Sequence, residues 1–156
     1  PRSTPLYSSA ASDVYKRQVH RIASRIDDRY EFVAGCLSST PDKALSSAKE
    51  IGIDSNRSYP DFKSMAEAEA SREDGIEVVS IVTPNHMHAS PSIEFLKKGI
   101  HVICDKPLTA TMDEAMELHN VVKSSDTHFF LTHNYSGYPH QPGLISVPHI
   151  QVSADA

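Results

Sequence analysis

The sequence predicts an α/β fold in which helices cover a doubly wound, mostly parallel sheet. Two β-branched apolar runs, at residues 78–82 and 100–103, are separated by a helical pattern, which is typical of one strand–helix–strand unit. Polar clusters end both runs, at residues 83–88 and 105–106. Because the carboxyl ends of parallel strands border the ligand crevice of such a sheet, we expect both clusters to lie on the same rim.

The composition is that of an ordinary globular chain. Of its 156 residues, 39% are hydrophobic and 22% are charged, which is enough apolar material for one domain with a core. The net charge of −5 argues against nucleic acid or an anionic membrane as a partner and favours small molecules. Cys36 and Cys104 fall within apolar runs, which predicts reduced core thiols in a cytoplasmic protein.

Residues 1–18 are expected to lie outside the fold. Residues 8–18 correspond in frame to the translation of a transposase-type sequencing adapter, and residues 1–7 fit the primer that precedes it. The alternative is a natural Ser-rich leader. On the adapter interpretation the natural protein begins upstream of Val19, and the first strand of its sheet is missing.

The elements of the first half follow in order. Residues 19–28 carry a one-sided apolar stripe at Val19, Ile22 and Ile26 that is typical of a helix. Residues 31–37 form an apolar run suited to a buried strand. Thr40 is a suitable N-cap for a helix that ends before Gly52.

The second half repeats the alternation of helix and strand. A helix over residues 62–72 has few apolar positions, so we expect it outside the sheet, with a solvated face at Glu67, Glu69 and Glu73. A helix over residues 111–125 is expected to bury Met112 and Met116. The other elements are strands at 76–82, 100–104 and 127–132 and a helix at 90–98, and residues 139–156 are expected to be an irregular tail or a frame-slipped end.

Two motifs resemble the Gfo/Idh/MocA oxidoreductases: Thr-Pro-Asn-x-x-His at residues 83–88, and Asp-Lys-Pro at residues 105–107 one strand later. The resemblance covers residues 19–138 and implies a partial Rossmann-type domain that binds NAD or NADP. It also implies hydride transfer to or from a sugar, polyol or related substrate held by a C-terminal domain that this chain lacks. The intact parent is then a homo-oligomeric enzyme and the present chain an inactive fragment, because the Gly-x-Gly-x-x-Gly turn that meets the pyrophosphate is absent. The alternative is a non-catalytic dinucleotide-binding or regulatory module.

The resemblance assigns roles to individual residues. Lys106 matches the lysine expected near the nicotinamide and the reacting oxygen, where it can exchange protons. Residues Thr83, Pro84 and Asn85 are expected to line the cofactor crevice, with His88 closing the turn behind them.

Other positions at the predicted rim carry alternatives. Asp105 replaces the glutamate usual before the lysine, which shortens the reach of its carboxylate to the cofactor ribose, and the Lys106–Pro107 bond can be cis. Asn134, past the last strand, is expected to touch the cofactor or to cap a turn. His86 and His88 are interpreted as polar turn residues rather than metal ligands, because no third ligand stands beside them.

The turn after the second predicted strand bears on the choice of cofactor. An acidic residue there would bind the ribose hydroxyls of NAD, but this chain has Ser38 and Ser39 instead. Hydroxyls without a carboxylate do not repel a 2′-phosphate, so we expect a slight preference for NADP, with Lys43 and Arg57 as candidate cations nearby. The alternative is that the serines only form the turn that caps the next helix.

Overall fold

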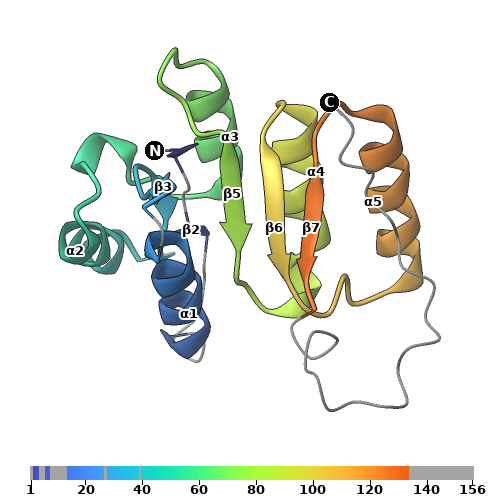
Figure 1. Cartoon of the computed structure of the whole chain (residues 1–156), viewed down its shortest axis with the longest axis horizontal. Coiled ribbons are helices and arrows are strands. Elements are labelled where there is room, and N and C mark those ends of the chain that lie inside the picture. Colours follow the sequence, from blue (N-terminus) through green and yellow to red (C-terminus); the bar gives the residue numbers. More distant parts are fainter. Residues whose placement is uncertain (1, 4–5, 8–13, 27, 39, 134–156) are drawn as a thin grey trace.

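Five parallel strands form the main sheet, in the order β4-β2-β5-β6-β7 (Figure 1). The computed structural model describes residues 2–3, 6–7, 14–26, 28–38 and 40–133, so the predicted tail lies outside the described residues. The strands are β2 (Leu6–Tyr7), β4 (Gly35–Cys36), β5 (Val78–Ile81), β6 (His101–Asp105) and β7 (Phe129–Thr132), and a second small sheet pairs β1 (Arg2–Ser3) with β3 (Tyr30–Glu31). The predicted doubly wound α/β fold is confirmed.

Helices lie on both faces of the main sheet (Figure 1). They are α1 (Val14–Arg25), α2 (Pro41–Ile51), α3 (Phe62–Ala70), α4 (Ala89–Lys97) and α5 (Met112–Ser124), with short 3-10 turns η2 (Ser55–Arg57) and η3 (Asn85–Met87). Helix α4 packs on β5 and β6, and α5 packs on α4. Within the described ranges, no helix is both long and apolar enough to cross a bilayer.

The start of the chain departs from the expectation that residues 1–18 lie outside the fold. Strand β2 pairs in parallel with β4 on one side and β5 on the other, with Leu6 in register with both Gly35 and Ser80. Helix α1 begins at Val14, before the predicted boundary at residue 19. A strand between β4 and β5 pairs backbone groups that would otherwise have no partner in the middle of the sheet. Backbone pairing depends little on side-chain identity, so no motif predicted it.

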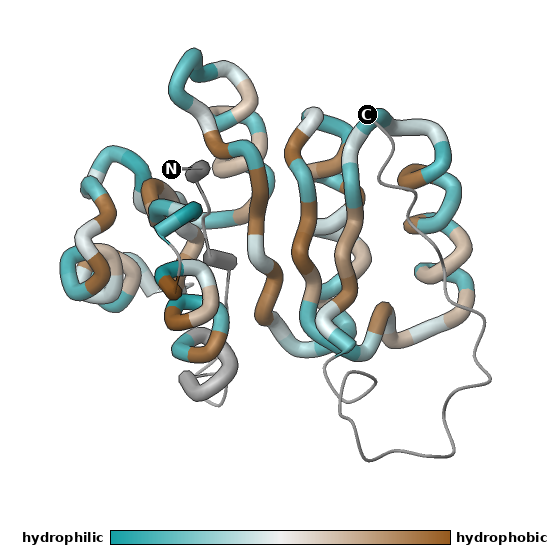
Figure 2. Tube along the Cα trace, in the orientation of Figure 1, coloured by the Kyte–Doolittle hydropathy of each residue, from teal (hydrophilic) through white to brown (hydrophobic). Residues whose placement is uncertain are grey.

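The core lies between the sheet and helices α3, α4 and α5. Phe95 and Leu96 of α4 are almost completely buried against β5 and β6, where the hydrophobic residues are concentrated in Figure 2. Cys36 and Cys104 are buried free thiols, as the sequence predicted. The alternation of side chains along β5 turns Val79 toward this core and Ser80 toward α1.

Helix α3 is buried more deeply than its composition predicted. Met65 and Ala66 have no exposed surface, and Glu69 is only 1% exposed. The predicted solvated face is therefore wrong at Glu69, whose carboxylate accepts hydrogen bonds from Arg57 Nε at 3.0 Å and from Tyr59 Oη at 2.7 Å. Because these partners precede Glu69 by ten or more residues and lie outside α3, helical periodicity could not reveal them.

Two predicted apolar stripes face outward instead. In α5 the buried residue is Leu118, whereas Met112 and Met116 are 76% and 54% exposed, so their predicted core position is wrong. The stripe of Val19 and Ile22 in α1 and Ile26 just after it is also exposed. A periodic stripe marks the side of a helix that is apolar, but it does not show that another element covers that side.

The helix ends are close to the predicted ones. Gly52 follows α2 with φ = 81°, the left-handed conformation that favours glycine, and Thr40 occupies the N-cap position. The Thr40 side chain makes no capping bond. The neighbouring Ser38 hydroxyl instead accepts the Thr40 backbone N–H at 3.1 Å.

Candidate functional site

The carboxyl ends of the parallel strands form one edge of the sheet. In the order β4-β2-β5, the chain moves from β2 to one neighbour and later returns to the opposite side, so the topological switch point lies between β2 and β5. Open α/β sheets bind ligands at this point, beyond the carboxyl ends of their strands. The edge is therefore the candidate cofactor crevice, with Ser38 after β4, residues 83–88 after β5 and Asp105–Lys106 at the end of β6.

The turn after β5 is held closed by its own hydrogen bonds. Thr83 is fully buried, and its Oγ1 donates to the carbonyl of Met87 at 3.0 Å. The N–H of Met87 bonds to the Pro84 carbonyl at 2.8 Å. Asn85 is exposed, and its Oδ1 accepts the N–H of His86. Thr83 thus shapes the turn with its side chain, whereas Pro84 and Asn85 are the members that reach the surface of the rim.

His88 connects the two motifs. The side chain is 1% exposed, and its Nδ1 lies 2.6 Å from the carbonyl oxygen of Pro107. Its Nε2 lies 2.8 Å from the carbonyl oxygen of Thr83. The expectation that the ends of β5 and β6 meet on one rim is confirmed, and His88 lies behind that rim, as the sequence predicted.

The end of β6 carries a carboxylate residue followed along the chain by a lysine. Thr132 is in register with Asp105 across β6 and β7, and its hydroxyl donates to Asp105 Oδ1 at 2.8 Å. Lys106 is exposed, and within the described part of the chain no hydrogen bond or ion pair engages its side chain. The Lys106–Pro107 peptide bond is cis, as the sequence allowed. Sequence reasoning missed Thr132, although its place at the end of the neighbouring strand was the available signal.

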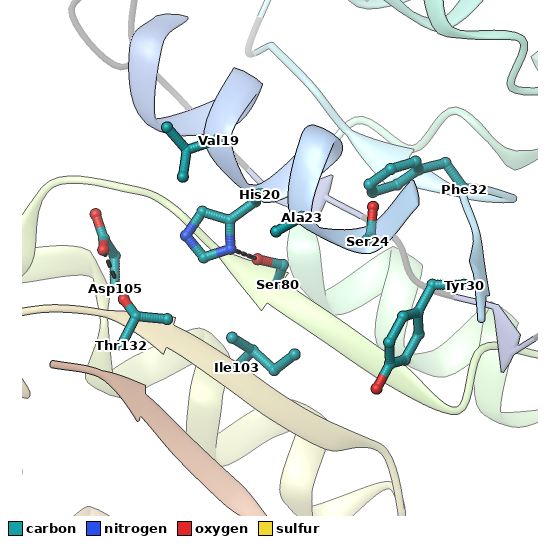
Figure 3. Close-up of a pocket in the computed structure, with 10 residues that line it drawn as sticks. All are labelled: Val19, His20, Ala23, Ser24, Tyr30, Phe32, Ser80, Ile103, Asp105 and Thr132. Carbon is teal, nitrogen blue, oxygen red and sulfur yellow. Dashed lines mark hydrogen bonds between the residues drawn. The ribbon is translucent and has the colours of Figure 1, made fainter. Parts of the chain in front are cut away.

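A cavity of about 390 Å³ lies between α1 and the face of β5, β6 and β7 (Figure 3). Its walls are mainly apolar. His20 Nδ1 lies 2.8 Å from the hydroxyl oxygen of Ser80 in the cavity, and the Asp105–Thr132 pair stands at one end of it, next to the rim. The other lining residues are Val19, Ala23, Ser24, Tyr30, Phe32 and Ile103.

The thiol beside the rim is not a ready nucleophile. Cys104 immediately precedes Asp105, and burial raises the pKa of its thiol to about 12. The thiolate is the reactive form of cysteine, so this thiol is inert at neutral pH.

The end of β4 offers fewer polar groups than the sequence suggested. Ser38 lies in the turn, while Ser39 lies outside the described residues, as does Asn134. Arg57 is 8% exposed and pairs with Glu69, so it is not a cation of the rim, contrary to the expectation from its sequence position. Lys43 is exposed on the first turn of α2.

The family model described as "Oxidoreductase family, NAD-binding Rossmann fold" (GFO_IDH_MocA) matches residues 14–133. The chain belongs to this family. An uncharacterized oxidoreductase of Bacillus subtilis (strain 168), YfiI, is 36% identical over 119 residues, which are 76% of this chain and 30% of the relative.

Solved structures of oxidoreductases share the fold. An oxidoreductase from Sinorhizobium meliloti is 54% identical with a TM-score of 0.81, and the match covers 89% of this chain and 39% of that one. An inositol dehydrogenase homolog from Azotobacter vinelandii, complexed with NADH and myo-inositol, is 32% identical with the same TM-score of 0.81, covering 88% of this chain and 36% of that one. The chain thus spans well under half the length of these relatives.

The polar residues at this edge fit the nicotinamide side of a dinucleotide better than its pyrophosphate. The carboxylate of Asp105, the ammonium group of Lys106 and the amide of Asn85 gather at the ends of β5 and β6, and Ser38 offers a hydroxyl at the end of β4. A Gfo/Idh/MocA cofactor domain brings backbone amides to the pyrophosphate through glycines after the central strand. Between β2 and α1 this chain has no glycine, and Gly35 is its first.

Proposed function

We propose that the chain carries the nicotinamide side of an NAD(P)-dependent oxidoreductase that acts on a sugar, a polyol or a related carbinol or carbonyl compound. The observation that carries this proposal is the single rim on which Asn85, Asp105 and Lys106 gather, with His88 joining the two loops. The polyol class is supported by the relative from Azotobacter vinelandii, whose structure contains NADH and myo-inositol.

Lys106 is the catalytic residue of the proposed reaction. When substrate is oxidised, a carbinol carbon loses a hydride and its hydroxyl loses a proton; bound NAD(P) supplies the hydride acceptor, carbon 4 of its nicotinamide. The Lys106 amine takes the proton in oxidation and returns it in reduction. Asp105, held by the Thr132 hydroxyl, accepts hydrogen bonds from ribose hydroxyls. Pro84 and Asn85 form the wall of the crevice on the β5 side.

The domain organisation is part of the proposal. Residues 19–138 belong to a cofactor domain, and the substrate is held by a further domain of a cytoplasmic, homo-oligomeric parent. The adapter interpretation of residues 1–18 concerns their origin, because β2 and the start of α1 are part of the fold. The matches cover only 30% and 39% of these relatives, which supports a further domain. The chain by itself is then inactive, because no glycine precedes Gly35 to form the turn that meets the pyrophosphate.

Replacement of Lys106 in the full-length oxidoreductase tests the proposed activity. Lys106→Ala is expected to lower kcat/KM by about 10²–10⁴-fold, the usual contribution of a positioned acid–base group, while the Kd for the cofactor changes little. Lys98→Ala is the matched control, because Lys98 is also exposed but lies at the opposite end of β6. Equal turnover in wild type and Lys106→Ala would remove the catalytic assignment. Cofactor binding without turnover of any polyol or sugar would favour the regulatory module.

The proposed preference for NADP has a separate test. Ser38 presents a hydroxyl and no carboxylate, and Lys43 supplies a cation on the adjoining helix. In the full-length protein kcat/KM for NADP should exceed that for NAD, and Ser38→Asp should reverse the order, because a carboxylate repels the 2′-phosphate and binds the ribose hydroxyls. A higher kcat/KM for NAD in the wild type would overturn this preference.

A further inference from the structure

His88 is held by hydrogen bonds to both its backbone and its ring. Its backbone carbonyl accepts the N–H of Ser92 at 3.2 Å and the Ser92 hydroxyl at 2.6 Å, and its backbone N–H bonds to the Asn85 carbonyl at 3.1 Å. Its ring nitrogens face two further carbonyls, and its side chain is buried. A ring held in this way has one orientation, so it can hold other groups in place.

The contact with Pro107 matters because this residue has no backbone N–H. Proline has no N–H, so the carbonyl is its only backbone hydrogen-bonding group, and that carbonyl faces His88 Nδ1 at 2.6 Å. Lys106 is the residue immediately before it, and its side chain extends into solvent. Lys106 therefore stands between two restrained residues: Asp105, which the Thr132 hydroxyl holds, and Pro107, whose carbonyl faces His88.

We propose that His88 is a positioning residue: its Nδ1–H holds the Pro107 carbonyl against the turn after β5 and thereby sets the position of Lys106 over the rim. The catalytic consequence rests on the proposed function, whereas the hydrogen bond and its effect on Lys106 do not. His88 is only 1% exposed, behind the turn after β5. Its effect on rate arises because a misplacement of about 1 Å in a reacting group can lower the rate about 10²-fold.

The ring chemistry restricts which form of His88 serves this role. A carbonyl oxygen only accepts, so each ring nitrogen bonds to its carbonyl only when it carries a proton. A neutral ring protonated on Nδ1 bonds to Pro107, and an imidazolium bonds to both Pro107 and Thr83. A neutral ring protonated only on Nε2 bonds to Thr83 and leaves the Pro107 carbonyl without a hydrogen bond from His88.

Two substitutions separate the hydrogen bond to Pro107 from the hydrogen bond to Thr83. The side-chain amide nitrogen of asparagine lies close to the position of Nδ1 in histidine, and that of glutamine lies close to the position of Nε2. His88→Asn therefore keeps a donor for the Pro107 carbonyl, and His88→Gln keeps a donor for the Thr83 carbonyl. His88→Asn loses the group that faces the Thr83 carbonyl and His88→Gln loses the group that faces the Pro107 carbonyl, so each variant removes one ring contact and we expect both to lower the thermal unfolding temperature.

Kinetics of the full-length enzyme measure the catalytic consequence. His88→Asn should keep kcat within about tenfold of wild type, whereas His88→Gln should lower kcat by about 10²-fold, with the KM for the cofactor nearly unchanged in both. Equal losses of kcat in the two variants, or losses confined to KM, would overturn the positioning role.

Nuclear magnetic resonance of the 156-residue chain tests the proposal without any activity. Long-range proton–nitrogen correlation spectra should show a proton on His88 Nδ1, and the Lys106 amide resonance should move in His88→Gln but stay in place in His88→Asn. An unprotonated Nδ1, or an equal movement of the Lys106 resonance in both variants, would overturn the proposal. An inactive full-length wild type with the expected spectra would instead contradict the proposed function alone.

Discussion

Replacing the buried carboxylate of Glu69 by an amide should destabilise the domain strongly. The Glu69 side chain has no exposed surface in its ion pair with Arg57, and its carboxylate also accepts the Tyr59 hydroxyl at 2.7 Å. Breaking one side of a buried pair costs about 3–5 kcal/mol, because the remaining charge stays buried. Arg57 retains Asp74, whose exposed carboxylate lies 3.5 Å away. The cost of Glu69→Gln should therefore fall near the lower limit, about 3 kcal/mol.

Urea unfolding of the 156-residue chain, followed by circular dichroism, measures this cost. Glu67→Gln is the matched control, because Glu67 lies on the same helix but is exposed; its effect should stay within about 0.5 kcal/mol. The double variant Arg57→Met with Glu69→Leu should recover most of the stability, because it leaves no unpaired charge. If Glu69→Gln were as stable as Glu67→Gln, the argument that this pair is desolvated would be refuted.

Three further outcomes follow from burial. Burial raises the thiol pKa values of Cys36 and Cys104 to about 12, so a thiol reagent at pH 8 should label both slowly in the native chain and rapidly in denaturant; rapid native labelling would contradict their burial. Burial and the bond to Glu69 raise the pKa of Tyr59 from 10.0 to about 12. Above pH 10 the unfolded chain releases this proton first, so stability should fall between pH 10 and 12, and Tyr59→Phe should lessen that fall in urea titrations. In α5, Leu118→Ala should cost about 2–5 kcal/mol and Met116→Ala far less; equal costs would mean that Met116 is covered in solution.

The rim could be predicted from sequence because its causes are local. β-branched runs before Thr83 and Asp105 determine where two strands end, and parallel pairing brings those ends to one edge. The register of Ile81 with Cys104 places them side by side in the structure. The role of His88 behind the turn was predicted only in outline, because its bond to Pro107 crosses nineteen positions of the chain.

The residues whose burial was predicted wrongly depend on tertiary contacts that local sequence patterns do not reveal. Glu69 has the pattern of a solvated glutamate, and only the return of the chain through Arg57 and Tyr59 buries it. Met112 has the pattern of a core residue, but α5 packs on α4 through Leu118 and leaves Met112 exposed. In both cases a period of 3.6 residues located the helix, while the packing partner decided which face was buried.

The unequal strands give the two ends of the rim different resistance to local opening. β6 is paired with β5 over residues 101–104 and with β7 over residues 102–105, whereas β4 meets the sheet through a neighbour only two residues long. Backbone amides with pairing on both sides exchange with solvent only in the larger openings of a domain, and sparsely paired edges open more often. Residues 102–104 of β6, which are paired on both sides, therefore belong to the slowest-exchanging part of the chain, and Asp105 directly follows them, while Ser38 follows a strand that can detach without disturbing β6.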